Sequence, residues 1–160
     1  MKEQIALEKT AGTAAVARQL KLMDRTQRHA VLATVSDGQP YTSLVAFAMM
    51  PDMTGVVFAT PRNTAKYRNL LQNKRVALLI DTRSNTDAAY MRSEAVTIVG
   101  TAAPVRRGRR REELASLLIR KHPALRSFVE ARTTSIVLLE AAVCFHTGSF
   151  QKVSEWRIRS

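Results

Sequence analysis

Short runs of strand length, joined by tight turns, restrict the folds open to this sequence more than any other feature. His29 to Ser36 is predicted as a strand with Val31, Ala33 and Val35 on one face, and Asp37–Pro40 follows as a hairpin turn, because Gly38 can adopt the positive φ that such turns require. Further runs cover Tyr41–Met50 and Gly55–Thr60, with a second turn between them. Together these runs predict a meander of three antiparallel strands.

Helical segments interrupt the strands without alternating regularly with them. The first predicted helical segment covers residues 3–23, with Val16, Leu20 and Met23 at helical spacing and Gly12 as a possible break. A second predicted helix covers Thr64 to Asn73. A third covers Glu112 to Lys121 and continues after His122-Pro123 through Leu125, Phe128 and Val129. The later predicted strands cover Arg75–Asp81, Glu94–Pro104 and Thr134–Phe145, with a polar loop over Ser84–Ala89 and a last extended segment from Ser149 through Trp156. This order favours a mainly β (α+β) fold, an antiparallel barrel with peripheral helices, over a doubly wound parallel sheet.

The length of 160 residues predicts a single domain over residues 1–160. Residues 1–25 form its N-terminal helical segment, and residues 105–131 form a helical insertion before the last strands. We find neither a signal peptide nor an apolar run long enough for a membrane span, so we expect a cytoplasmic protein with no membrane partner. The single cysteine, Cys144, lies in an apolar run and is interpreted as a buried, inert thiol.

The formal net charge is +12, and much of it lies in the block Arg106–Arg111, which holds five arginines. The favoured interpretation is a solvated linker that enters a helix. The alternative is that the block attracts nucleic acid or a phosphorylated ligand. No aromatic residue interleaves the block to stack on bases, so a basic, nucleic-acid-associated protein remains the third functional hypothesis, and nucleic acid is not the expected partner.

The segment FATPRNTAK, Phe58 to Lys66, is a candidate anion site. The third predicted strand ends at Thr60, and a short amphipathic helix begins near Thr64 and Lys66. Hydroxyl groups, unpaired backbone N–H groups and one ammonium at a helix N-terminus are suited to bind a phosphate. The competing interpretation is that Thr64 is an ordinary N-cap and Lys66 a surface lysine.

Several segments in this order carry a family resemblance. They are His29–Pro40 (HAVLATVSDGQP), Val57–Thr60 (VFAT), Thr64–Asn73 (TAKYRNLLQN), Arg75–Asp81 (RVALLID) and Val96–Ala102 (VTIVGTA). Over roughly residues 25 to 103 the chain resembles the pyridoxamine 5′-phosphate oxidase-like, FMN-binding split-barrel superfamily. The resemblance implies a six-stranded split β-barrel and a homodimer with FMN bound in the cleft between subunits.

The same resemblance implies a set of cofactor-binding residues. Thr60, Thr64 and Lys66 match the positions that contact the FMN phosphate, and Ser43, Leu44 and Val45 match the strand that lies along the flavin ring, mainly through backbone atoms. A plain barrel strand is the alternative for these last three. Arg62 and Arg68 are candidate replacement cations. Trp156 either stacks on the flavin of the partner subunit or seals the barrel.

The chain also departs from the family pattern. Ser43 and Ala48 stand where the B6-phosphate oxidases have Arg and Lys, Ala65 stands where they have Arg, and Ala95 stands where they have Gln. Their C-terminal Arg–His signature is not recognisable in the last six residues. These departures argue for a divergent member that is not a B6-phosphate oxidase.

Two hypotheses therefore precede the nucleic-acid one. The first is an FMN-binding oxidoreductase of unknown small-molecule substrate, with NAD(P)H or a small organic reductant as electron donor; the sequence identifies no catalytic residues for it. The alternative is a non-enzymatic split-barrel module that binds heme or another cofactor, with His146 as a candidate iron ligand. Metal-ligand spacing is absent among the three histidines and one cysteine, so no other metal site is predicted.

Overall fold

The first hairpin of the chain has the geometry that its turn sequence predicts. In the computed structural model, which describes residues 12–148 and 152–158, β1 (His29–Ser36) pairs antiparallel with β2 (Gln39–Met49). Asp37 and Gly38 have positive φ values of 49° and 76°, as in a two-residue type I′ turn. β3 (Gly55–Pro61) then pairs antiparallel with β2, which confirms the predicted meander.

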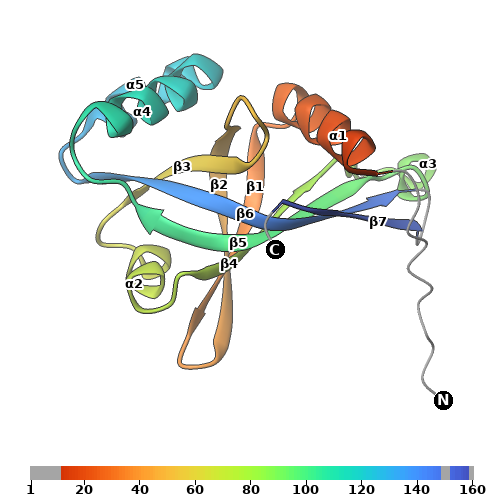
Figure 1. Cartoon of the computed structure of the whole chain (residues 1–160), viewed down its shortest axis with the longest axis horizontal. Helices are drawn as coiled ribbons and strands as arrows, with labels where there is room; N and C mark the ends of the chain where they lie inside the picture. Colours follow the sequence, from red (N-terminus) through yellow and green to blue (C-terminus); the bar gives the residue numbers. More distant parts are fainter. Residues whose placement is uncertain (1–11, 149–151, 159–160) are drawn as a thin grey trace.

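The sheet closes because β3 also pairs with a strand late in the chain. The sheet of the described residues has the order β3-β2-β1-β4-β5-β6-β7, with β4 (Arg75–Asp81), β5 (Ala95–Pro104), β6 (Thr134–Gly148) and β7 (Lys152–Arg157). β3 joins β6 from Gly55↔Glu140 to Pro61↔Thr134, and all pairs are antiparallel (Figure 1). The predicted six-stranded antiparallel barrel is confirmed, and β7 is an additional strand outside the ring.

β6 is long because its two halves have different partners. The first half pairs with β3, and the second half, from Val143, pairs with β7. Between the halves, the register with β5 shifts at Gly100, where β6 carries one extra residue. A Cβ atom at Gly100 would lie 2.0 Å from the Glu140 carbonyl oxygen, so only glycine allows this close approach. The bulge thus marks the point where β6 leaves the ring.

α1 (Gly12–Thr26) covers one opening of the barrel. Its residues Val16, Leu20 and Met23 are fully buried, as their helical spacing predicts. They pack into the same hydrophobic core as barrel residues such as Phe47 and Phe58. The N-terminal helix is therefore part of the core.

A second layer lies outside the barrel wall. α4 (Arg109–Lys121), the 3₁₀ turn η1 (Pro123–Leu125) and α5 (Arg126–Glu130) connect β5 to β6 and lie together at one end of the molecule (Figure 1). Leu114, Leu118 and Val129 pack there against Val57 and Ile136 on β3 and β6. This layer corresponds to the helical insertion predicted over residues 105–131.

Some predicted boundaries differ from the structure. The stretch Ser84–Ala89, predicted as a loop, contains the start of a short helix, α3 (Asp87–Tyr90). α4 begins at Arg109 rather than Glu112. Gly108, its N-cap, has a positive φ of 134°, which favours glycine and turns the backbone just before Arg109. Arg109 to Arg111 are therefore the first turn of a helix and not part of a linker. The helical prediction for residues 3–11 and the start of the last segment at Ser149 lie outside the described residues.

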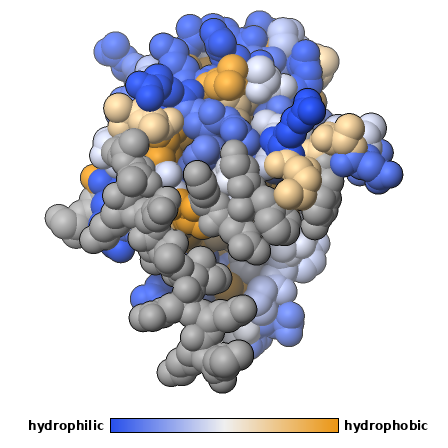
Figure 2. All heavy atoms as spheres, turned by 90° about the vertical axis from the view of Figure 1, so that its right-hand side faces the viewer, coloured by the Kyte–Doolittle hydropathy of each residue, from blue (hydrophilic) through white to orange (hydrophobic). Residues whose placement is uncertain are grey.

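Hydrophilic side chains predominate on the face of the molecule shown in Figure 2, and hydrophobic ones occur there in small groups. Within the ranges 12–148 and 152–158, no helix is both long enough and apolar enough to cross a membrane. Cys144 is buried in the barrel core, as its apolar neighbours predict.

Candidate cofactor site

Two threonine hydroxyls meet where β3 ends and α2 (Ala65–Gln72) begins. Thr60 Oγ1 lies 2.9 Å from Thr64 Oγ1, and the Thr64 hydroxyl donates to the Pro61 carbonyl at 2.9 Å. Thr64 is also the N-cap of α2 and accepts a hydrogen bond from the Tyr67 N–H at 3.4 Å. The predicted convergence of Thr60 and Thr64 is present, and the N-cap interpretation of Thr64 is correct as well.

This corner can bind an anion. The first turn of a helix has N–H groups without intrahelical acceptors and carries the positive end of the helix dipole. Lys66 is in this turn and is only partly exposed. A phosphate here can accept hydrogen bonds from the free N–H groups of this turn, and Lys66 supplies the opposite charge. The two threonine hydroxyls, which now bond to the Pro61 carbonyl and to each other, would have to rotate to donate to it.

The position of α2 is fixed by a buried pair of polar side chains. Asn69 Nδ2 donates to Thr34 Oγ1 on β1 at 3.0 Å, and both residues are buried. Leu70, the next residue of α2, packs in the barrel core. Sequence reasoning missed Asn69 and Thr34, because it placed Tyr67, Leu70 and Leu71 on the inward stripe of the helix and the opposite face of β1 in the core. In the structure Asn69 is buried in place of Leu71, which is 59% exposed. The helix N-terminus is therefore held rigidly against the barrel.

The three β2 candidates have different environments. Val45 is buried in the barrel core, whereas Leu44 is 63% exposed. The Ser43 hydroxyl oxygen is buried and has no hydrogen-bond partner among the described residues. A buried hydroxyl normally has a partner, so Ser43 is suited to contact a bound group.

The position of Ala48 explains one departure from the family pattern. Ala48 is buried in the outer layer with Leu114 and Leu118 of α4. A lysine at this position would bury a charged side chain inside the apolar cluster, which is energetically unfavourable. α4 therefore occupies the space that a longer side chain on β2 would need.

Arg62 and Arg68 lie near the same corner, whereas Trp156 does not. Arg62, in the loop between Thr60 and Thr64, lines a cavity beside the start of α4, and the exposed Arg68 of α2 donates back to the Asn63 carbonyl of that loop at 3.2 Å. Trp156 pairs with Cys144 on β6, whereas Thr60 pairs with Ser135. Those two β6 residues are nine positions apart, roughly 30 Å at about 3.3 Å per residue.

Within one subunit, Trp156 thus lies at the far end of β6 from Thr60 and packs partly buried against the barrel core. The sealing role predicted for Trp156 fits this position. A contact between Trp156 and a flavin remains a prediction for the partner subunit.

His146 lies near that far end as well. Its Nε2 is 3.6 Å from Glu94 Oε2, and this nitrogen is buried without a hydrogen-bond partner among the described residues. Glu94 also accepts a short hydrogen bond from Gln19 of α1. His146 and Thr60 therefore belong to different regions of the molecule.

The comparisons with known proteins agree with this fold. A family model described as pyridoxamine 5′-phosphate oxidase matches residues 15–143, whereas no curated protein matches the sequence. Among solved structures, a heme binding protein from Mycobacterium smegmatis has a TM-score of 0.78 and 17% identity, covering 92% of this chain and 59% of that one. This chain thus spans about three-fifths of the length of that protein.

Two other solved structures match more of their own length. An FAD-binding protein from Mesorhizobium loti has a TM-score of 0.66 and 15% identity, covering 81% of this chain and 90% of that one. The second is a protein from Clostridium acetobutylicum related to general stress protein 26 and described as of the pyridoxinephosphate oxidase family. It has a TM-score of 0.68 and 12% identity, covering 90% of this chain and 95% of that one. At these identities the likeness shows a shared fold. Because the family model matches most of the sequence, this chain belongs, as a divergent member, to the pyridoxamine 5′-phosphate oxidase family.

Proposed function

We propose that the protein is an FMN-binding flavoprotein. The observation that carries the proposal is the convergence of the Thr60 and Thr64 hydroxyls, 2.9 Å apart, at the N-terminus of a helix whose first turn contains Lys66. A phosphate monoester has close to two negative charges at neutral pH, and this corner supplies N–H donors and a cation, with two hydroxyls that can rotate toward a bound phosphate.

The flavin ring would lie along β2. The buried Ser43 hydroxyl lacks a partner among the described residues, which supports a polar contact with a bound group at this point. When bound, FMN supplies the electron-transfer chemistry, and the chain binds and orients it. We infer an oxidoreductase that acts on a small molecule, with NAD(P)H or a small organic reductant as donor. The apolar surroundings of Ala48 argue against a B6-phosphate substrate.

The proposal includes a homodimer with the cofactor between the subunits. Leu44 on β2 and Leu71 on α2, the two elements that carry the candidate site, are 63% and 59% exposed, and Tyr41 on β2 is 45% exposed. Large apolar side chains exposed beside a binding site are typical of an interface. A second copy of the chain would cover them and could bring its Trp156 to the flavin.

An absorption spectrum of the purified protein tests the function. We expect the two visible bands of bound flavin, either as purified or after addition of FMN followed by gel filtration. A folded dimer that retains no flavin at micromolar concentrations would overturn the proposal.

Heme binding is the second candidate. It is favoured by the buried Nε2 of His146, which forms no hydrogen bond among the described residues and lies 3.6 Å from Glu94 Oε2, and by the fold shared with the heme binding protein of M. smegmatis. Added hemin would then give a Soret band that weakens in His146→Ala. Because His146 and Thr60 lie in different regions, this substitution should leave flavin binding unchanged.

A further inference from the structure

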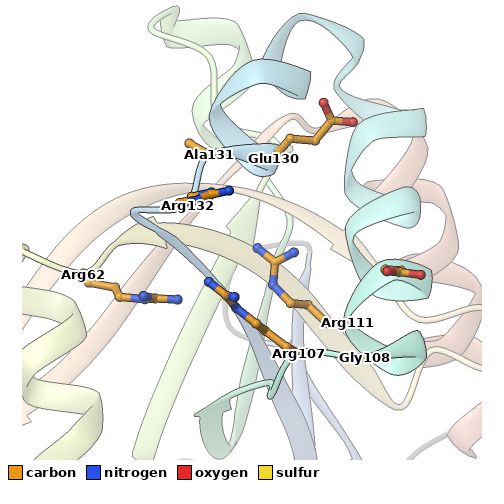
Figure 3. A pocket seen from close by; sticks show the side chains of 8 residues that line it. Arg62, Arg107, Gly108, Arg111, Glu130, Ala131 and Arg132 are labelled. Atoms are coloured by element: carbon orange, nitrogen blue, oxygen red, sulfur yellow. The ribbon is translucent and has the colours of Figure 1, made fainter.

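Arginines from three separate segments surround one cavity. The cavity has a volume of about 370 Å³ and lies between the β3–α2 loop, the start of α4 and the turn before β6. Arg62, Arg107, Arg111 and Arg132 line it, and we call them the arginine pocket. Figure 3 shows these side chains converging on the space between the β3–α2 loop and α4.

The backbone holds these segments together. The Arg62 N–H donates to the Thr133 carbonyl at 3.1 Å, and Pro61 pairs with Thr134 at the closure of the barrel. The Arg111 guanidinium is partly buried and reaches the Thr134 carbonyl at 3.5 Å. The convergence is therefore built into the fold and does not depend on loose side chains alone.

Of the residues that the structure describes, four arginines but only two carboxylates line the pocket, so its lining carries an excess of positive charge. Among the described residues, none of the four guanidinium groups forms an ion pair with a carboxylate. The two carboxylates that line the same cavity are Glu112 and Glu130. Glu130 pairs with Arg126 at 3.2 Å and points away from the guanidinium groups in Figure 3, and Glu112 is exposed and forms an ion pair with none of them. Like charges gathered around one cavity repel each other, and a bound anion would relieve this repulsion.

The start of α4 adds to the positive potential. Its N-cap, Gly108, lines the cavity, has no side chain to cap the helix, and is followed by Arg109, Arg110 and Arg111. Cations in the first turn oppose the helix dipole, which favours anions there. A guanidinium group binds a phosphate through a pair of hydrogen bonds. The four arginines of the arginine pocket together can therefore bind more than one phosphate group.

We propose that the arginine pocket binds a small ligand with two linked phosphate groups, such as a nucleoside diphosphate. The lining of this pocket differs from that of the candidate cofactor site: Arg62 lies in the loop between Thr60 and Thr64, but neither threonine nor Lys66 lines the cavity. The cavity has room for a small ligand, and no aromatic residue of the described chain lines it to stack on the bases of a nucleic acid.

Calorimetric titration with inorganic pyrophosphate and with ADP tests the proposal. The test variant is Arg107→Gln/Arg132→Gln, because both side chains are exposed and line the pocket. The control is Arg106→Gln/Arg110→Gln, which removes the same charge from exposed residues outside the cavity. We expect the test variant to weaken both ligands by about tenfold or more and the control by less than about threefold.

The variant Lys66→Ala distinguishes binding at the arginine pocket from binding at the candidate cofactor site. Pyrophosphate binding should be unchanged in this variant if the arginine pocket is the site. Three results would overturn the proposal: equal losses in the test and control variants, loss of binding in Lys66→Ala alone, or tighter binding of a single-stranded oligonucleotide than of ADP. Circular dichroism of each variant confirms that the fold is retained.

Discussion

Asp24 of α1 and Lys121 of α4 form an ion pair, with 2.9 Å between Lys121 Nζ and Asp24 Oδ1. The same carboxylate oxygen accepts the Met49 N–H at 3.0 Å, and the ammonium lies 3.5 Å from the centroid of the Phe47 ring. Both partners therefore also contact β2. The pair links the core helix, the barrel wall and the outer helical layer at one point.

Removal of this link should destabilise the fold. We expect Lys121→Met to lower the free energy of unfolding by about 1–3 kcal/mol, because Asp24 would lose its partner in a mostly buried position. Urea denaturation measures the change. The control is Arg126→Gln, which breaks the exposed pair with Glu130 and should cost less than about 1 kcal/mol. Equal losses would contradict the structural role of Asp24 and Lys121.

His122 should make stability depend on pH. Its Nε2 lies 2.8 Å from the Phe47 carbonyl, so the neutral ring donates this hydrogen bond. Burial lowers the pKa of His122, the Phe47 carbonyl opposes the shift, and the charge of Lys121 adds to it. The unfolded chain then binds a proton near pH 6.5, where the folded protein does not.

The contribution of His122 is therefore complete above about pH 6.5 and falls as the pH drops toward the lowered folded-state pKa. Urea titrations between about pH 5 and 8 should show this decline. His122→Gln should flatten the profile, whereas His29→Gln, at an exposed position, should retain it. An unchanged profile in His122→Gln would assign the pH dependence to other groups.

Cys144 should be unreactive in the folded protein. Burial raises the pKa of its thiol to about 12, so at pH 8 roughly one molecule in ten thousand carries the thiolate that reacts. We expect no labelling by a thiol reagent before denaturation and complete labelling in guanidinium chloride. Rapid labelling of the native protein would show that the barrel core opens near Cys144.

The elements that could be predicted from the sequence are those whose own residues determine their conformation. The turn at Gly38 requires positive φ, and the stripe Val16, Leu20, Met23 fits one helix face. The strand β1 is present, but its buried face is Ala30, Leu32 and Thr34 and not the predicted set Val31, Ala33 and Val35, because the apolar run Ala30–Ala33 makes both faces of the strand apolar. The boundary at Arg109 was missed because six consecutive basic or glycine residues were read as solvated chain. Gly108, the N-cap of α4, marks the helix boundary within that block.

The contacts that escaped prediction join distant segments. Asn69 and Thr34 are 35 residues apart, and Lys121 and Asp24 are 97 apart. Arg62 meets Arg111 only because β3 and β6 close the barrel in one particular register. Strand register depends on the packing of the whole core, so spacing along the sequence does not show which side chains meet.

Leu44 tests the proposed homodimer. Leu44→Asp places a charge on the exposed apolar part of β2 and should convert the dimer to a monomer of 17.8 kDa. Gel filtration with light scattering measures the mass. The control is Leu22→Asp on α1, where the leucine is 44% exposed and lies away from the candidate site. Dissociation by both substitutions, or by neither, would contradict an interface at Leu44.

Lys66 tests the proposed phosphate contact. Lys66→Ala removes a charge-assisted hydrogen bond of about 1.5–3 kcal/mol, so the dissociation constant for FMN should rise about tenfold or more. Quenching of flavin fluorescence measures this constant. Lys74→Ala, which removes the same charge from an exposed position just beyond α2, should have little effect. If Lys66→Ala leaves the affinity unchanged while Arg62→Gln or Arg68→Gln lowers it, the phosphate is bound by those arginines instead.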